Sequence, residues 1–234
     1  MPKGSKETCF EDLKTRILTI DLEPGADLDE TSISSSYGIS RTPLREVLQR
    51  LAGEGYVEIE MNRGAKVASM SVTAMRTFFQ TAPLIYSNLA RLAAENRTGS
   101  QLKSLKKAQH DFRTAVLREE PTVAALNNHA FHDVVGQMAH NPYLYACLQR
   151  LLIDHTRLGQ TFYRPADAAE RSLIQRAEQQ HDAMIEAIEA GEPDLAIDLT
   201  LQHWDLSRDR MERFVRPDPL PLDGGSIGGY RRAL

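Results

Sequence analysis

The chain has 234 residues, of which 41% are hydrophobic and 26% are charged, so it is too apolar for a disordered protein and long enough for two small domains. No stretch approaches the roughly 18 apolar residues of a membrane span, and no apolar signal-peptide core follows the start, so we expect a soluble, cytoplasmic protein without membrane contact. Two cysteines are too few for a disulfide framework. With 28 Lys and Arg against 32 Asp and Glu, the formal charge of −4 gives no general argument for a nucleic-acid partner.

Three helices are predicted near the N-terminus. Apolar residues at helical spacing indicate a first helix over 8–20, and a serine-rich second helix over 30–36 ends before Gly38. The third helix, over 41–53, has the clearest signals, because Ser40 stands at its N-cap position and proline falls in its first turn. Its apolar stripe consists of Leu44, Val47, Leu48 and Leu51.

Two short β-prone runs follow these helices, over 56–61 and 65–68, and the Asn-Arg-Gly between them is typical of a hairpin connection. Three helices followed by a two-stranded wing predict a winged helix-turn-helix domain over 1–70.

From residue 71 onward the strand signals end, and amphipathic patterns are separated by short breaks that contain proline or glycine. We therefore expect a mainly α protein in which an all-α six-helix bundle over 71–215 follows the winged domain. A tail rich in proline and glycine, over 216–234, is expected to be flexible. The six helices are expected over 71–97, 100–119, 121–140, 142–163, 167–190 and 193–215.

The third helix has the side chains of a DNA-reading head at its N-terminal end, which is the end that enters the major groove in helix-turn-helix proteins. Arg41 and Arg45 are four residues apart and share the face opposite the leucines, and the fork of an arginine matches O6 and N7 of guanine. Thr42 suits a thymine methyl group or a phosphate. The residues expected at phosphates are Ser40 at the helix start, Arg63 at the wing tip and Lys66 behind it.

The alternative is that these arginines lie on an ordinary solvated helix face. Residues 1–75 hold 9 Lys and Arg against 12 Asp and Glu, which favours that alternative. The order of the features, with a proline-started helix followed by a glycine-bounded wing, favours DNA binding.

The motifs resemble a known family. The run Gly-Ile-Ser-Arg-Thr-Pro-Leu-Arg-Glu over 38–46 and the run Arg-Gly-Ala over 63–65 are similar to the DNA-binding domain of GntR-family bacterial transcription regulators. The later helices resemble the FCD effector domain of the FadR subfamily. The resemblance implies a homodimer that binds a palindromic double-stranded operator and changes its grip when a small metabolite occupies the helical domain. Repression is the commoner mode of the family, so a repressor is favoured.

A possible metal site follows from spacing in the helical region. Asn128 and His132 are four residues apart and lie on one helix face. His181 and His203 lie ten and twelve residues from Gly191, so an antiparallel pair of helices that turns there brings both imidazoles to a similar height. Three imidazole nitrogens and an amide oxygen suit a divalent transition ion, zinc first, with nickel or manganese as alternatives.

The resemblance supports the same site. Metal-containing relatives usually carry an acid, two further residues and Phe-His, followed by two later histidines, and Phe131-His132, His181 and His203 match this pattern. Asn128 replaces the acid, which leaves more positive charge on the ion to attract an anionic effector. Ordinary roles are expected for His110, His129, His140 and His155.

We expect the metal to hold the carboxylate of a small organic acid. The polar candidates for the rest of the effector pocket, each of which is equally suited to an ordinary surface position, are Arg91, Arg157, Gln160 and Tyr163. Relatives often carry an Arg and a Glu in the first helix of this domain, where this chain has Ala82 and Tyr86.

Three functions fit these observations. The leading hypothesis is a ligand-responsive transcription regulator without enzymatic activity. The second is a metal-dependent hydrolase with an N-terminal association module, although the sequence offers no assignable general base. The third is an architectural DNA-binding protein without an effector.

Overall fold

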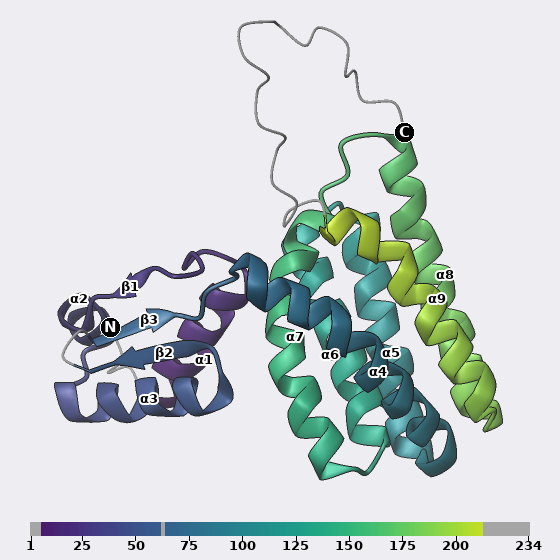
Figure 1. Ribbon diagram of the computed structural model, residues 1–234, viewed down its shortest axis with the longest axis horizontal. Coiled ribbons are helices and arrows are strands. Elements are labelled where there is room, and N and C mark those ends of the chain that lie inside the picture. Colours follow the sequence, from purple (N-terminus) through teal and green to yellow (C-terminus); the bar gives the residue numbers. More distant parts are fainter. Residues whose placement is uncertain (1–5, 62–63, 213–234) are drawn as a thin grey trace, which may run out of the picture.

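The computed structural model describes residues 6–61 and 64–212, with side chains described up to residue 206. Figure 1 shows a small head of short helices and strands beside a bundle of long helices. The head consists of α1 (Lys6–Leu18), β1 (Asp27–Leu28), α2 (Glu30–Tyr37), α3 (Arg41–Glu54), β2 (Val57–Glu60) and β3 (Gly64–Val67). The bundle consists of α4 (Val72–Asn96), α5 (Gly99–Leu117), α6 (Pro121–Met138), α7 (Pro142–Phe162), α8 (Ala168–Ala190) and α9 (Pro193–Glu212).

The head is a winged helix-turn-helix, as the sequence predicts. The apolar stripe of α3 is fully buried and packs against α1, whose Phe10, Leu13 and Ile17 are also buried. Burial of these leucines fixes which face of α3 points outward. The α3 helix ends at Gly55, whose φ of 90° is readily adopted by glycine.

The sheet has one strand more than the sequence predicts. It is antiparallel in the order β1-β3-β2, with Val57 opposite Val67 and Asp27 opposite Lys66. The β1 strand is two residues long, too short for alternation of apolar and polar residues to be recognised. It pairs with the free edge of β3.

The bundle confirms the mainly α prediction, with helix ends within a few residues of those expected. In Figure 1, α4 leads from the head across the face of the bundle, and it packs against α6, α7, α8 and α9. The α8 and α9 helices form the antiparallel pair predicted around Gly191. No helix among the described residues is both long and apolar enough to cross a membrane. The tail expected over 216–234 lies outside the described residues.

The α7 helix joins the bundle to the head. Its Ile153 is buried in the apolar cluster of the head. Arg157 is 1% exposed, and its Nη1 donates a 2.6 Å hydrogen bond to the carbonyl oxygen of Ala68, just after β3. Gln160 Nε2 donates to the carbonyl oxygen of Leu18 at the end of α1. The head is therefore docked through both apolar packing and buried polar contacts.

Candidate functional site

The DNA-reading residues expected on α3 are presented to solvent. Ser40, Arg41, Thr42 and Arg45 are exposed, while the leucine face packs inward. Among the described residues Arg41 has no ion pair, and Arg45 Nε lies 3.6 Å from Glu30 Oε2 with its side chain 69% exposed. An ion pair at this distance and exposure is weak, so it leaves Arg45 able to reach a base. Ser40 caps α3 without using its hydroxyl for a cap hydrogen bond.

The wing offers less to a phosphate than expected. Lys66 forms ion pairs with Glu60 and, at 3.7 Å, with Glu58. A phosphate contact from Lys66 therefore has to compete with two carboxylates. Arg63, the other residue expected at a phosphate here, lies outside the described residues.

The predicted metal ligands come together inside the bundle. His132 and Asn128 extend from α6, His181 from α8 and His203 from α9, and all four are at least nine-tenths buried. One ligand nitrogen from each of the three histidines lies within 4.8 Å of the other two. Residues from three helices thus surround one point, as the spacing argument requires.

Hydrogen bonds fix which nitrogen of His181 faces this point. The side-chain nitrogen of Gln109 donates to the carbonyl oxygen of Glu178 and to Asp182 Oδ1. The side-chain oxygen of Gln109 is therefore turned toward His181 Nδ1, 3.0 Å away, and accepts its proton. His181 Nε2 is left with a lone pair pointing into the cluster.

His203 Nδ1 lies 3.2 Å from Gln180 Oε1, a contact that suits a proton on this nitrogen. The Nε2 atoms of His181 and His203 lie 3.2 Å apart. In the tautomers that carry the proton on Nδ1, each Nε2 has a lone pair for a cation placed between them. Two nitrogens bound to one tetrahedral zinc ion are about 3.3 Å apart, given Zn–N bonds of 2.0–2.1 Å.

Two polar atoms of the predicted ligands have no partner. Asn128 Oδ1 and His132 Nε2 are buried without a hydrogen-bond partner in the described structure. An unpaired buried acceptor costs about 1–3 kcal/mol, so both atoms have reason to meet a cation. Asn128, His132, His181 and His203 therefore fit a divalent transition ion.

His155 is a neighbour of this cluster that the sequence analysis missed. Its ring centroid lies 5.1 Å from that of His132, and its Nδ1 shares a 2.8 Å hydrogen bond with the hydroxyl of Tyr86. Tyr86 comes from α4 and His155 from α7, so no local spacing could indicate the pair. By contrast, His129 turns away to Thr156.

The four buried imidazoles are set for the neutral form that a metal requires. Burial lowers the pKa of His155 to about 3 and the pKa of His203 to about 4. Burial and the neighbouring imidazoles together lower the pKa of His132 and of His181 well below the usual value.

A small enclosed cavity adjoins the donor atoms. Its volume is about 10 Å³, and its lining residues are Asn128, His155, Gly159, Phe162, Tyr163, Ala177 and His203. This is about the space that one water molecule needs. In the described conformation no carboxylate ligand fits beside the donors.

The expected effector residues are not all brought to this cavity. Tyr163 lines it. Arg91 is exposed and paired with Glu95 on the surface of α4. Arg157 and Gln160 instead contact the head, as described above. That role depends on which face of α7 meets the head, which the sequence does not reveal.

Comparison with known proteins identifies the two parts of the chain. Residues 5–67 match the model of the gntR family of bacterial regulatory proteins, and residues 79–206 match the FCD domain model. The chain belongs to the GntR family of transcription regulators, with an FCD domain. The FadR subfamily is consistent with this pairing.

The relatives of this GntR-family chain are regulators by name. The HTH-type transcriptional repressor RspR of Escherichia coli is 30% identical over 127 residues. The match spans 54% of this chain and 56% of RspR, little more than half of each. The HTH-type transcriptional repressor NanR of Cronobacter sakazakii is 26% identical over 83% of this chain and 80% of NanR.

Solved structures show the same fold at lower identity. Escherichia coli McbR/YncC has a TM-score of 0.76 at 17% identity, over 90% of this chain and 98% of that one. A GntR regulator from a Rhodococcus species has a TM-score of 0.67 at 18% identity, over 88% and 96%. At this identity the likeness concerns the fold alone.

Proposed function

We propose that the protein is a ligand-responsive repressor in which the FCD domain holds a divalent transition metal and controls how the head grips DNA. The proposal rests on the position of α7, which lies between the donor cluster and the head. Its residues 153, 157 and 160 contact the head, whereas His155 and Gly159 line the cavity at the donor cluster. These two sets lie on opposite faces of one helix.

The metal would be held by His132, His181, His203 and the amide oxygen of Asn128. When bound, it supplies a positive charge that attracts a carboxylate oxygen, with zinc favoured over nickel or manganese for this donor set. Gln109 and Gln180 orient the imidazoles through their Nδ1 protons, as outer ligands of metal sites commonly do.

The head would read a double-stranded operator. Arg41 and Arg45 reach base edges, Thr42 reaches a thymine methyl group or a phosphate, and Ser40 with the first amides of α3 binds a phosphate. We propose a homodimer, whose two heads meet two half-sites of a palindrome. An operator-binding role places the protein in the cytoplasm.

Carboxylate binding would act on the head through α7. A ligand that enters beside His155 and Gly159 has to move α7 or its neighbours, because the cavity is too small for it. Any shift of α7 changes the contacts of Ile153 and Arg157 with the head. A ligand can move this equilibrium by as much as its affinities for the two arrangements differ.

The hydrolase alternative has little support. None of the relatives named above is described as an enzyme. The ionisable side chains that line the enclosed cavity are histidines and a tyrosine, with no carboxylate to serve as a general base.

The test is metal analysis followed by thermal unfolding with a panel of small carboxylic acids. We expect close to one transition ion per chain, and a carboxylate present at 100 times its Kd should stabilise the protein by about 2.7 kcal/mol. The His181→Ala/His203→Ala double variant should lose both effects, whereas His110→Ala, on the surface of α5, should keep them. Retention of the ion by the double variant would contradict the metal site.

A further inference from the structure

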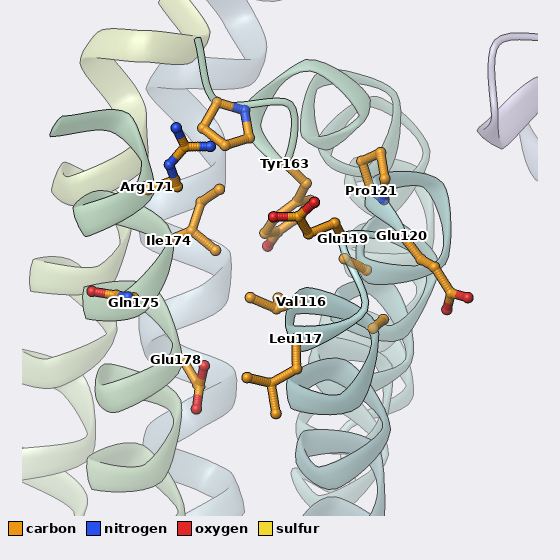
Figure 2. A pocket seen from close by; sticks show the side chains of 13 residues that line it. Val116, Leu117, Glu119, Glu120, Pro121, Tyr163, Arg171, Ile174, Gln175 and Glu178 are labelled. Carbon is orange, nitrogen blue, oxygen red and sulfur yellow. The ribbon is translucent and has the colours of Figure 1, made fainter. Parts of the chain in front are cut away.

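A large surface hollow lies on the bundle close to the small cavity. Its volume is about 440 Å³, and it is formed by the end of α5, the start of α6, the end of α7 and the N-terminal half of α8. Figure 2 shows Ile174 on one side, Val116 and Leu117 on the other, and Tyr163 above Val116 in the view. No residue of this hollow was expected at a ligand except Tyr163.

The hollow and the enclosed cavity are neighbours along three helices. On α6, Ala124 lines the hollow and Asn128, one turn on, lines the cavity. On α8, Ile174 lines the hollow and Ala177, one turn on, lines the cavity. Tyr163, at the end of α7, lines both. Tyr163 therefore lies where the hollow and the cavity meet.

Tyr163 is held in this position by packing. Its ring lies edge-on to Phe112 and Phe162, with centroid distances of 5.4 and 5.1 Å. It also covers Gly159, where an added Cβ would lie 3.5 Å from the ring. The hydroxyl has no hydrogen bond to a described residue, so displacement of the ring breaks no polar contact. Tyr163 caps α7 immediately before the loop that leads to α8, where the backbone has room to adjust.

We propose that the hollow is the outer half of the effector site and that Tyr163 is the gate to the metal-binding half. The inference rests on the proposed metal function. A ligand that enters this way places its carboxylate at the donor cluster and its body between Ile174 and Val116. Displacement of Tyr163 supplies the room that the enclosed cavity lacks.

The lining of the hollow defines the class of ligand. Its walls are apolar at Val116, Leu117 and Ile174. Of its charged lining residues, Glu178 is paired with Arg113, and Figure 2 shows the side chain of Glu120 pointing away from the hollow. Glu119 and Arg171 remain, and their charges are opposite. The apolar walls therefore define the ligand, which is a carboxylate with an apolar body.

Access to a cysteine behind Tyr163 tests the gate without any need for metal. In a Cys147→Ser background, which removes the exposed thiol, Ala177→Cys places a thiol in the enclosed cavity. The remaining Cys9 reacts slowly, because burial raises the pKa of its thiol to about 11. The rate at which methyl methanethiosulfonate modifies this thiol is then measured in three proteins, which carry Tyr163, Tyr163→Phe or Tyr163→Ala.

We expect Tyr163→Ala to raise the rate about tenfold or more, and Tyr163→Phe to leave it within about twofold, because the ring closes the gate and the hydroxyl does not. Leu117→Ala is the matched control, since it removes an apolar side chain that lines the hollow but not the cavity. Equal rates for Tyr163 and Tyr163→Ala, or an equal acceleration by Leu117→Ala, would overturn the gate.

The ligand class is tested by thermal unfolding of zinc-loaded protein that keeps Ala177 and Tyr163. Hexanoate should give half-maximal stabilisation at about tenfold lower concentration than acetate, which lacks the apolar body. Equal effects of the two acids would overturn the assignment of the hollow. If the protein binds no zinc, the proposed function fails, while the thiol rates of the metal-free protein still decide whether Tyr163 is the gate.

Discussion

Two exposed arginines of α3 differ in how strongly they are held within the head. Arg50 and Arg45 are both exposed on α3, but Arg50 is paired with Glu7 and Glu54 and lies over the ring of Phe10. Arg45 has one weak ion pair, near the N-terminal end of α3. We therefore propose a DNA-reading role for Arg45 and a structural role for Arg50.

Replacement of Arg45 tests the reading role. Arg45→Ala should weaken binding to the operator by about 1–3 kcal/mol and relax preference at one base pair, because a bidentate contact to guanine is lost. A fluorescence-anisotropy titration with a duplex selected from a random library measures the effect. Arg118→Ala, at the end of α5, is the control for loss of one positive charge. Unchanged affinity and base preference in Arg45→Ala would remove it from the reading head.

The buried imidazoles give the metal-free protein a predictable response to pH. The pKa values of these imidazoles are lower in the folded state than in the unfolded chain. Between about pH 6.5 and the pKa of the folded state, the unfolded chain therefore binds protons that the native chain does not bind. Stability should therefore fall as the pH falls below about 6.5, by up to about 1.4 kcal/mol per pH unit for each imidazole.

Urea unfolding of chelator-treated protein between pH 7 and 5.5 measures this slope. His155→Gln removes one such imidazole and should reduce the slope by about one proton equivalent. The exposed His110→Gln should leave it unchanged. A stability that does not vary over this range would show that the imidazoles are not buried in the neutral form.

At the scale of elements, α7 is the helix through which the bundle contacts the head. Ile153 of α7 packs into the apolar cluster of the head. The guanidinium of Arg157 pairs with Asp154 and donates a hydrogen bond to the carbonyl oxygen of Ala68. The α7 helix also approaches the head closely at Gly55. A Cβ added at Gly55 would lie 2.5 Å from Cδ of Arg150 on α7. A side chain at position 55 would have to displace Arg150.

Arg157→Met should destabilise the protein by about 3 kcal/mol, because it leaves the buried Asp154 carboxylate without its main partner. The Asp154→Asn/Arg157→Met double variant should recover part of this loss, since it removes the uncompensated charge. Urea unfolding followed by circular dichroism measures both. A loss well below about 1 kcal/mol in the single variant would mean that the pair does not hold the head on α7.

Local sequence patterns predict some of these elements and contacts but not others. Periodicity and caps predicted each of the long helices, because residues that repeat every turn encode the buried face locally. The grouping of His132, His181 and His203 could be predicted for the same reason, since helical spacing and one helical hairpin bring them together. The Tyr86–His155 pair, the α7 face against the head and the β1 strand depend on contacts between distant segments, so local patterns could not reveal them.

For the whole molecule, the fold places the candidate sensing site on one side of α7 and the DNA-reading head on the other. The enclosed cavity beside the histidines accepts no ligand larger than water as it stands. Ligand entry displaces Tyr163 at the C-terminal end of α7, so a change in the contacts of this helix with the head is expected to accompany it. Coupling of this kind is commonly about 5–150-fold in affinity.

The most direct measurement is the operator affinity of the full chain by fluorescence anisotropy at fixed salt, for chelator-treated protein, zinc-loaded protein and zinc-loaded protein with saturating hexanoate. We predict that hexanoate weakens operator binding of the zinc-loaded protein by at least about fivefold and has no effect without zinc. The same Kd in all three states, with zinc and hexanoate shown to be bound, would contradict the proposed link between the histidine cluster and the head.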